Sequence, residues 1–316
     1  MKSGILLVLF SGALAALLCA LLIPLLKRLR AGQYILGYVK EHEAKSGTPT
    51  MGGIAFVAAA AAAAAVFGLY ADRHTLVAVT FGLAYTAVGF LDDFLKIRGR
   101  HNLGLHAWQK IVFQIVVAVF AGLYCYQNEL TVFSLPLSKI SFDAGIWTIP
   151  LVAFAFVAAT NCVNLTDGLD GLAASVGFWY FAAFAALIFL AGAGTPLAGL
   201  CLALCGALAG YLLFNTNRAS VFMGDTGSLG MGGFAAAVAA FSGNLLFLPV
   251  VGIMFVCSGI SVILQVIYYK RTKKRIFLMA PLHHHFQQKG YAESKIAYAY
   301  SFVTAAAGLC CLFFAI

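Results

Sequence analysis

The stretch GILLVLFSGALAALLCALLIPLL occupies residues 4–26 and contains no charged side chain. A helix needs roughly 20 apolar residues to cross the hydrocarbon layer of a bilayer, and this segment meets that length. It is longer than the core of a signal peptide, has no A-x-A cleavage site and is followed by the basic residues KRLR. The stretch therefore predicts a retained membrane-spanning helix rather than a cleaved leader.

The composition of the whole chain agrees with this interpretation. Apolar residues make up 62% of the 316 residues, charged residues only 10%, and the mean hydropathy is +0.94. This excludes water-soluble globular proteins, so the bilayer is the expected solvent. The net charge of +9 then indicates membrane topology, and no nucleic-acid partner is expected. The eight cysteines form no CxxC pair and are expected to be free, buried thiols.

Further apolar segments follow along the chain, and together they predict about ten membrane-spanning helices. No internal repeat and no water-soluble domain is apparent, so residues 1–316 are expected to form a single all-α polytopic membrane domain. The predicted spans are 4–26, 52–71, 75–91, 111–127, 146–163, 172–191, 196–213, 228–242, 245–268 and 296–316.

Lysine and arginine residues indicate how these spans are oriented. With ten spans, both chain ends lie on the same side of the membrane. Of the 20 Lys and Arg residues, 17 fall in one set of loops, so the positive-inside rule places that set in the cytoplasm and both termini outside. The stretch 130–147 is expected to be an external hairpin or interfacial loop. The basic set comprises 27–50, 92–110, 164–171, 214–228 and 269–295.

Two adjacent carboxylates end the third predicted span, in VGFLDDFLKIRGR (88–100). Neighbouring side chains on a helix point about 100° apart, so Asp92 and Asp93 cannot face one site equally. We expect one to face a site while the other orients a neighbour. The alternative is a solvated helix end with an ion pair from Asp93 to Lys96.

A second polar interruption is NCVNLTDGLDGLA (161–173). Asn164, Asp167 and Asp170 supply polar groups at every third residue, and Gly168 permits close approach of a ligand to the backbone. A plain loop between two helices is the alternative, but such a loop needs fewer polar groups.

Two further loops precede apolar segments. In VFMGDTGSL (221–229), Asp225 would hold a cation, with an N-cap aspartate as the alternative. In KSGTPTMGG (45–53), Lys45 and Thr50 suit contacts with a phosphate or a sugar, with a capped helix start as the alternative. All of these loops, and the histidine loop near the C-terminus, fall on the predicted cytoplasmic face. Carboxylates for Mg²⁺ among lysines for phosphates are typical of phosphoryl transfer.

Five motifs in order, KSGTPTMGG, LDDFLK, NLTDGLDGLA, VFMGDTGSL and MAPLHHHF, resemble the polyprenyl-phosphate N-acetylhexosamine-1-phosphate transferases. The resemblance runs from Lys45 to about Gly290 and includes the number of spans. It implies Mg²⁺-dependent transfer of a sugar phosphate from a UDP carrier to undecaprenyl phosphate in the inner, cytoplasmic membrane of a bacterium. MAPL before HHH resembles the branch that uses UDP-MurNAc-pentapeptide and forms lipid I for peptidoglycan. A homodimer surrounded by membrane lipid is the expected assembly.

The resemblance also implies roles for individual residues. It makes Asp92, Asp93 and Asp225 the acidic trio of the catalytic centre. Asp225 is the first candidate Mg²⁺ ligand, Asp92 and Asp93 are further candidates, and Asp92 is a base or an orienter for the lipid phosphate. The candidate phosphate and nucleoside contacts are Lys45, Thr50, Lys96, Lys110, Asn164, Asp167, Gly168, Asp170, Asn215, Phe222 (stacking on the base), Gln265 and His285.

The sequence departs from the family pattern at two positions, and other functions stay open. The family commonly has an acid where this chain has Gln287, and a glutamate near Ser258. A relative that uses UDP-N-acetylglucosamine is one alternative. An ion-coupled transporter is another, but transporter sites usually lie near the midplane between repeated halves. A purely structural membrane protein would not need so many polar residues in short loops.

The histidine triplet of MAPLHHHFQQKG (279–290) has several interpretations. Consecutive side chains diverge on a helix, so three imidazoles holding one metal is not expected there. The predicted loop that contains the triplet, 269–295, has seven Lys and Arg residues, which favours anions as ligands. We therefore predict a phosphate-facing wall opposite the acidic trio, with His283 and His284 as catalytic contacts. For His285, a structural role is the alternative to substrate binding.

Overall fold

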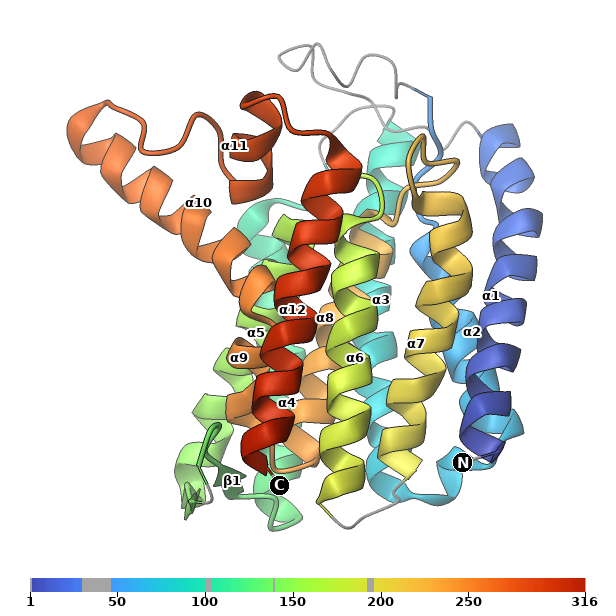
Figure 1. The fold of residues 1–316 in the computed structure, drawn as a ribbon, viewed down its shortest axis with the longest axis vertical. Coiled ribbons are helices and arrows are strands. Elements are labelled where there is room, and N and C mark those ends of the chain that lie inside the picture. The colour runs from blue at the N-terminus through green and yellow to red at the C-terminus, as the bar shows by residue number, and fades with distance from the viewer. Residues whose placement is uncertain (1, 30–46, 100–103, 139, 192–195, 316) are drawn as a thin grey trace.

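Helices account for nearly all of the regular secondary structure in the computed structural model, which describes residues 2–29, 47–99, 104–138, 140–191 and 196–315. The long helices run side by side, and both chain ends lie at the same end of the bundle (Figure 1). The helices are α1 (Lys2–Arg28), α2 (Gly53–Val66), α3 (Arg73–Gly99), α4 (Ala107–Gln127), α5 (Thr148–Thr166), α6 (Leu172–Leu190), α7 (Pro196–Asn215), α8 (Gly224–Phe241), α9 (Leu248–Val251), α10 (Ile253–Thr272), α11 (Leu282–Gln288) and α12 (Glu293–Ala315), with short 3₁₀ turns η2 (Leu69–Ala71), η3 (Gly145–Trp147) and η4 (Leu245–Phe247).

The prediction of a multi-pass membrane protein is confirmed, but the count of ten spans is not. Each predicted span contains a helix, and eight of the described helices are long and apolar enough to cross a bilayer. These eight are α1, α3, α4, α5 with η3, α6, α7, α10 and α12.

Two predicted spans fall short for local reasons. The span predicted at 52–71 stops as the 14-residue helix α2, because the chain turns through Gly68 in the left-handed conformation before η2. The span predicted at 228–242 corresponds to α8, whose first ten residues include five glycines and few large apolar side chains.

Helix α8 lies at the centre of the bundle, and every one of its residues from Thr226 to Phe241 is buried. It packs against α2, α3 and α5, and its small residues allow the neighbouring backbones to come close. At Gly89 of α3, the first carbon of any side chain would overlap the backbone of Asp225. The contact between α3 and α8 therefore depends on a glycine.

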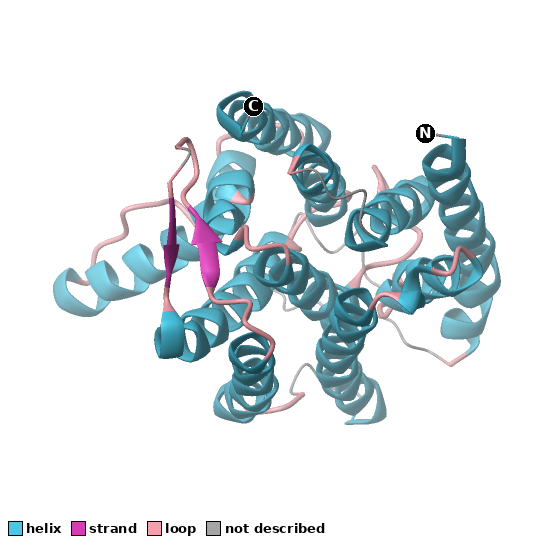
Figure 2. Cartoon of the chain, turned by 90° about the horizontal axis from the view of Figure 1, so that it is seen from below, coloured by secondary structure: helices cyan, strands magenta, loops and turns pink. Residues whose placement is uncertain are grey.

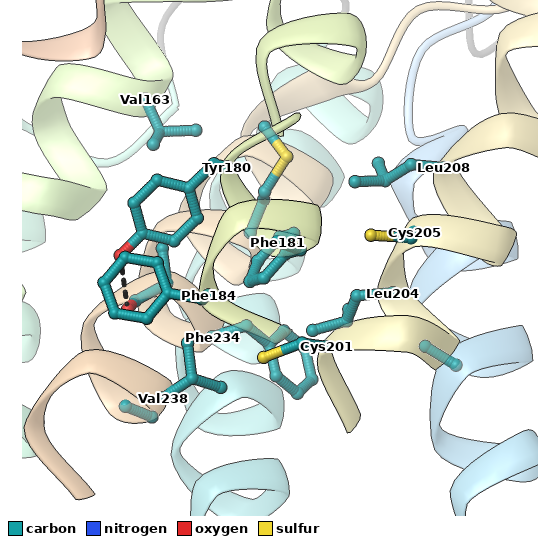
Figure 3. Close-up of a cluster of buried hydrophobic side chains, with 14 of the residues drawn as sticks. Val163, Tyr180, Phe181, Phe184, Cys201, Leu204, Cys205, Leu208, Phe234 and Val238 are labelled. Carbon is teal, nitrogen blue, oxygen red and sulfur yellow. Dashed lines mark hydrogen bonds between the residues drawn. The ribbon is translucent and has the colours of Figure 1, made fainter. Parts of the chain in front are cut away.

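Large side chains fill the space between α6, α7 and α8 (Figure 3). Tyr180, Phe181 and Phe184 of α6 are buried there, and the Tyr180 hydroxyl donates a hydrogen bond of 3.0 Å to the Ala235 carbonyl. Cys201 and Cys205 of α7 lie in the same cluster. All eight cysteines of the chain are free, as predicted, but Cys310 is exposed and Cys162 and Cys257 are only partly buried, so the prediction that all are buried is wrong.

A short antiparallel hairpin, β1 (Val132–Ser134) with β2 (Ser141–Asp143), lies at the same end of the bundle as the two chain ends (Figures 1 and 2). It confirms the hairpin predicted in 130–147, and the exposed Trp147 follows it. At the opposite end, α10 slants away from the bundle and the chain returns through α11 (Figure 1). That end also carries the C-terminus of α3 and the start of α8.

Candidate active site

Three carboxylates meet where the last turns of α3 approach the first turn of α8. One oxygen from each of Asp92, Asp93 and Asp225 lies within 4.8 Å of the other two. Asp92 and Asp93 are almost completely buried, with 0% and 2% of their surface exposed. The predicted acidic trio is therefore formed by the adjacent pair Asp92 and Asp93 together with Asp225, which lies 132 residues further along the chain than Asp93.

Two lysines lie among the three carboxylates. The Lys96 Nζ is 2.6 Å from Asp92 Oδ2, 3.6 Å from Asp93 Oδ1 and 3.3 Å from Asp225 Oδ2. The Lys110 Nζ, from the first turn of α4, is 2.7 Å from Asp225 Oδ2 and 3.3 Å from Asp92 Oδ1. Both lysine side chains stay partly exposed, so the cluster is not sealed from solvent around them.

The two adjacent aspartates have different partners, as predicted. Asp92 faces the lysines and accepts a hydrogen bond of 2.8 Å from the Leu105 amide. Asp93 accepts from the Thr226 amide at 2.9 Å and from the Thr226 hydroxyl at 2.7 Å, and so holds the start of α8. The alternative of a solvated helix end is wrong in that both carboxylates are buried, but its ion pair from Asp93 to Lys96 does form, at 3.6 Å.

Asp225 does not cap its own helix, so the N-cap alternative is also wrong. Met223 is at the N-cap position, and the helix has no side-chain cap. The Asp225 carboxylate instead accepts a hydrogen bond of 2.9 Å from Asn164 at the end of α5, whose amide also lies 2.8 Å from the Ser228 hydroxyl. Asn164 therefore contacts the acidic trio and fixes the position of the Asp225 side chain, while its predicted role in substrate binding stays a prediction.

The loop containing Thr50 pairs with the loop that precedes α8. The Phe222 amide donates to the Pro49 carbonyl, and the Gly52 amide donates to the Phe222 carbonyl, both at 2.8 Å. If Gly224 carried a side chain, its first carbon would lie 2.6 Å from the Thr50 hydroxyl and 2.5 Å from an Asp93 oxygen, so both groups are close to Gly224. Thr50 is therefore placed beside the trio. Lys45, its predicted partner in phosphate binding, lies outside the described residues.

The histidine triplet lies on helix α11, but the expected divergence does not hold for His283 and His284, whose ring centres are 4.3 Å apart. His283 is buried, and the Nε2 atoms of both His283 and His284 approach Gly168 so closely that any side chain at Gly168 would collide with His283. The His285 Nδ1 accepts a hydrogen bond of 3.1 Å from the Leu278 amide. His283 and His284 thus contact the DGLDG loop (residues 167–171), and His285 stabilises the segment that leads into α11.

The DGLDG loop is fixed by several hydrogen bonds. Asp170 accepts from the Ala219 amide at 3.0 Å, and the Gly171 amide donates to Asn215 Oδ1 at 3.1 Å. Asp167 has no such described hydrogen bond. Burial, and then the negative charges of Asp225, Asp93 and Asp170, raise the pKa of the Asp167 carboxyl to about 8. Asp167 therefore carries a proton near neutral pH in the ligand-free protein.

Some side chains predicted to contact the substrate form hydrogen bonds to the protein backbone instead. The Gln265 side chain accepts from the amides of Ile276 and Phe277 at 3.1 and 3.0 Å, and so ties the loop after α10 back to that helix. The Asn215 amide group donates to the Val221 carbonyl at 3.0 Å, so both of its polar atoms hold backbone. Phe222 is partly exposed, and no described contact shows a stacking partner for its ring. Their substrate-binding roles stay predictions.

Other residues of the site were missed. Thr226 and Ser228 bind Asp93 and Asn164, and the hydroxyls in GDTGS were the available sign of them. Glu293 accepts a hydrogen bond of 3.1 Å from the Asp170 amide and another of 3.2 Å from Gln287. Nothing in the sequence pattern placed Glu293 next to that loop.

The trio suits a hard divalent cation. Mg²⁺ prefers oxygen ligands and is usually held by one or two carboxylates together with substrate phosphates. Asp92, Asp93 and Asp225 carry three negative charges against the two positive charges of Lys96 and Lys110, which leaves net negative charge for a cation. Lysines beside the same carboxylates offer positive charge to phosphate oxygens. The arrangement is therefore equipped for transfer of a phosphoryl group.

Comparisons with known proteins point to the same chemistry. The profile described as glycosyl transferase family 4 matches residues 74–243, and a signature of phospho-N-acetylmuramoyl-pentapeptide-transferases matches residues 45–57. A protein of that name from Heliobacterium modesticaldum is 42% identical over 294 residues, which cover 92% of this chain and 91% of that protein. Proteins of the same name from Clostridium botulinum and Shouchella clausii are 40% and 43% identical, and the matches cover 90% and 89% of their lengths.

Proposed function

Because the chain belongs to the phospho-N-acetylmuramoyl-pentapeptide-transferase family, we propose that it transfers phospho-MurNAc-pentapeptide from UDP-MurNAc-pentapeptide to undecaprenyl phosphate. The products are lipid I and UMP, and the reaction serves peptidoglycan synthesis. The convergence of Asp92, Asp93 and Asp225 with Lys96 and Lys110 is the observation that carries the proposal, since it joins carboxylates for a metal to cations for phosphates.

Mg²⁺ is the proposed cofactor. Asp225 would hold it first, with Asp92 and Asp93 as further ligands, because these oxygens are the carboxylate atoms that converge. When bound, Mg²⁺ would neutralise the charge that develops on the diphosphate oxygens of the donor.

The residues of the chain supply positioning and charge. An oxygen of undecaprenyl phosphate attacks the phosphorus attached to the sugar, and the bond from that phosphorus to the oxygen of the UMP phosphate breaks. Lys96 and Lys110, whose side chains are partly exposed, hold phosphate oxygens through their ammonium groups. Asp92 orients both lysines, to which it is ion-paired, and a phosphate nucleophile needs no further deprotonation. We therefore favour direct attack without a covalent enzyme intermediate.

The two Nε2 atoms of His283 and His284 at Gly168 give the site a second wall. The charged imidazolium donates hydrogen bonds through both ring nitrogens, and a neighbouring phosphate favours that charged form. We assign these two side chains to the phosphate groups of the substrates. Phe222, Asp167 and Asp170 are assigned to the nucleoside side of the donor.

We also propose where the protein lies in the cell and how it is oriented in the membrane. The site lies at the end of the bundle opposite the two chain ends (Figure 1), and most cations of the sequence fall in the loops of the site's side. We propose an inner, cytoplasmic membrane location with the site in the cytoplasm, both termini outside, and α2 and α8 completing ten spans. A homodimer stays a prediction.

A transfer assay with two donors tests the function. Purified protein in detergent is mixed with undecaprenyl phosphate, Mg²⁺ and either radiolabelled UDP-MurNAc-pentapeptide or radiolabelled UDP-N-acetylglucosamine. The proposal expects label in the lipid phase and released UMP with the first donor only. Transfer only from UDP-N-acetylglucosamine would support the alternative enzyme. Substrate-dependent ion flux in proteoliposomes without UMP release would support a transporter.

A further inference from the structure

A chain of hydrogen bonds connects the histidine triplet to α12 and to the DGLDG loop. His284 Nδ1 lies 2.9 Å from Gln287 Oε1, and Gln287 Nε2 donates to Glu293 Oε1 at 3.2 Å. The other Glu293 oxygen accepts from the Asp170 amide at 3.1 Å.

The direction of each bond in this chain is fixed by chemistry. An ionised carboxylate only accepts hydrogen bonds, so Gln287 must present its NH₂ group to Glu293. The Gln287 carbonyl oxygen then faces His284, and because it too only accepts, the His284 Nδ1 must carry the hydrogen. In the neutral imidazole, Nε2 is therefore left unprotonated.

That second nitrogen approaches the DGLDG loop. The His284 Nε2 lies 3.1 Å from the position that a side-chain carbon at Gly168 would take, on the loop that also bears Asp167 and Asp170. We propose that Gln287 and Glu293 are positioning residues that hold His284 in its Nδ1–H tautomer, so that Nε2 is the nitrogen presented to the substrate phosphates. The inference rests on the proposed function of the site only for the identity of that ligand.

The amide at position 287 also sets the charge next to His284. A carboxylate in direct contact with an imidazole favours the charged imidazolium. Gln287 provides the same acceptor without that charge, and the negative charge of Glu293 lies one hydrogen bond further away. Among the described residues, His283 is a titratable neighbour whose ring centre is 4.3 Å from that of His284, and the loop that His284 Nε2 approaches bears Asp167 and Asp170. His284 is thereby kept able to gain its proton at Nε2 when a phosphate arrives.

Three variants separate this role from a merely structural one. Gln287→Leu removes both hydrogen bonds of the amide. The double variant Gln287→Glu, Glu293→Gln exchanges the two groups and can keep the three hydrogen bonds described above, because the new amide donates to the new carboxylate and still accepts from the Asp170 amide. Gln288→Leu is the matched control, since Gln288 is exposed at the end of the same helix.

The primary measurement is ¹⁵N NMR of histidine-labelled full-length protein in detergent, with the His284 signal assigned by its loss in His284→Gln. The wild-type protein and Gln288→Leu should show the Nδ1–H tautomer, and Gln287→Leu should move His284 toward Nε2–H. The double variant should retain Nδ1–H, with the midpoint of its His284 titration raised by about one to three pH units. In the transfer assay, kcat should fall roughly tenfold for Gln287→Leu, as for loss of about one hydrogen bond, and recover in the double variant.

A wild-type His284 protonated on Nε2, or a tautomer that does not change in Gln287→Leu, would overturn the inference. Should Gln287→Leu fail to fold, the double variant still decides, because loss of the Nδ1–H tautomer there contradicts the assignment. Absence of UMP release by the wild-type protein would count against the proposed function, while the tautomer result would stand independently.

Discussion

Asp167 differs from the other acids of the site because it keeps a proton near neutral pH. Its pKa of about 8 lies above the value near 3.9 of an unfolded aspartate. The folded state therefore binds one more proton than the unfolded state between roughly pH 4 and 8. The contribution of this group to stability is complete below the unfolded pKa and is lost as the pH rises through about 8.

Asp167→Asn should remove this pH dependence. Between pH 5 and 8 we expect the melting temperature of the wild-type protein to fall more steeply than that of Asp167→Asn, with parallel curves above that range. Tryptophan fluorescence on heating in detergent measures both, since the chain contains three tryptophans. Parallel curves throughout pH 5–8 would show that Asp167 is already ionised in the folded protein.

At the scale of residues, the sequence predicted which residues belong to the site better than which residues pair with one another. Asp92, Asp93, Asp225 and Asn164 stand out because a carboxylate or an amide next to apolar segments is costly unless it has a partner. Their partners could not be read from the pattern. Lys110 pairs with Asp225 across 115 residues, a contact that only the packing of α4 against the bundle creates.

At the scale of elements, the contact between α3 and α8 assembles the trio. Gly89→Ala should separate these helices, because the added carbon would overlap the Asp225 backbone. Alanine is normally the better helix former by about 1 kcal/mol, so a fall in stability would indicate the clash rather than helix propensity. We expect a loss of about 1–3 kcal/mol, as for overpacked cores, together with reduced UMP release.

The control for this prediction is Ala87→Val, which adds carbon atoms on the exposed face of the same turn of α3. It should leave the melting temperature and UMP release close to wild type. If Gly89→Ala behaves like the control, α3 and α8 do not depend on this close approach.

Element lengths were predicted less well than element positions. Hydropathy located a helix in every predicted span, because apolar composition is averaged over many residues. It could not show that α2 stops at Val66, where the left-handed turn at Gly68 ends the segment. Likewise, the range 245–268 reads as one apolar run but is divided at Gly252 into α9 and α10.

At the scale of the whole molecule, the proposed orientation can be measured directly. In a variant with its native cysteines replaced, a single cysteine is introduced at Ser141 of the exposed hairpin or at Gln288 near the histidine triplet. A membrane-impermeant maleimide applied to intact cells should label Ser141→Cys only, because the hairpin and the site lie at opposite ends of the bundle. Labelling of Gln288→Cys alone would invert the proposed topology.

The central claim is that the carboxylate cluster is the catalytic centre, and Asp225→Asn tests it most directly. The side chain keeps its shape but loses the charge that contacts Lys96, Lys110 and Asn164. Asp143→Asn, on the exposed hairpin, is the matched control. The measurement is UMP release from UDP-MurNAc-pentapeptide and undecaprenyl phosphate with Mg²⁺, with melting temperature recorded for each protein. We predict a loss of at least about 10²-fold for Asp225→Asn, the size expected for one transition-state electrostatic group, with the protein still folded. Release near the wild-type rate by folded Asp225→Asn would contradict the account.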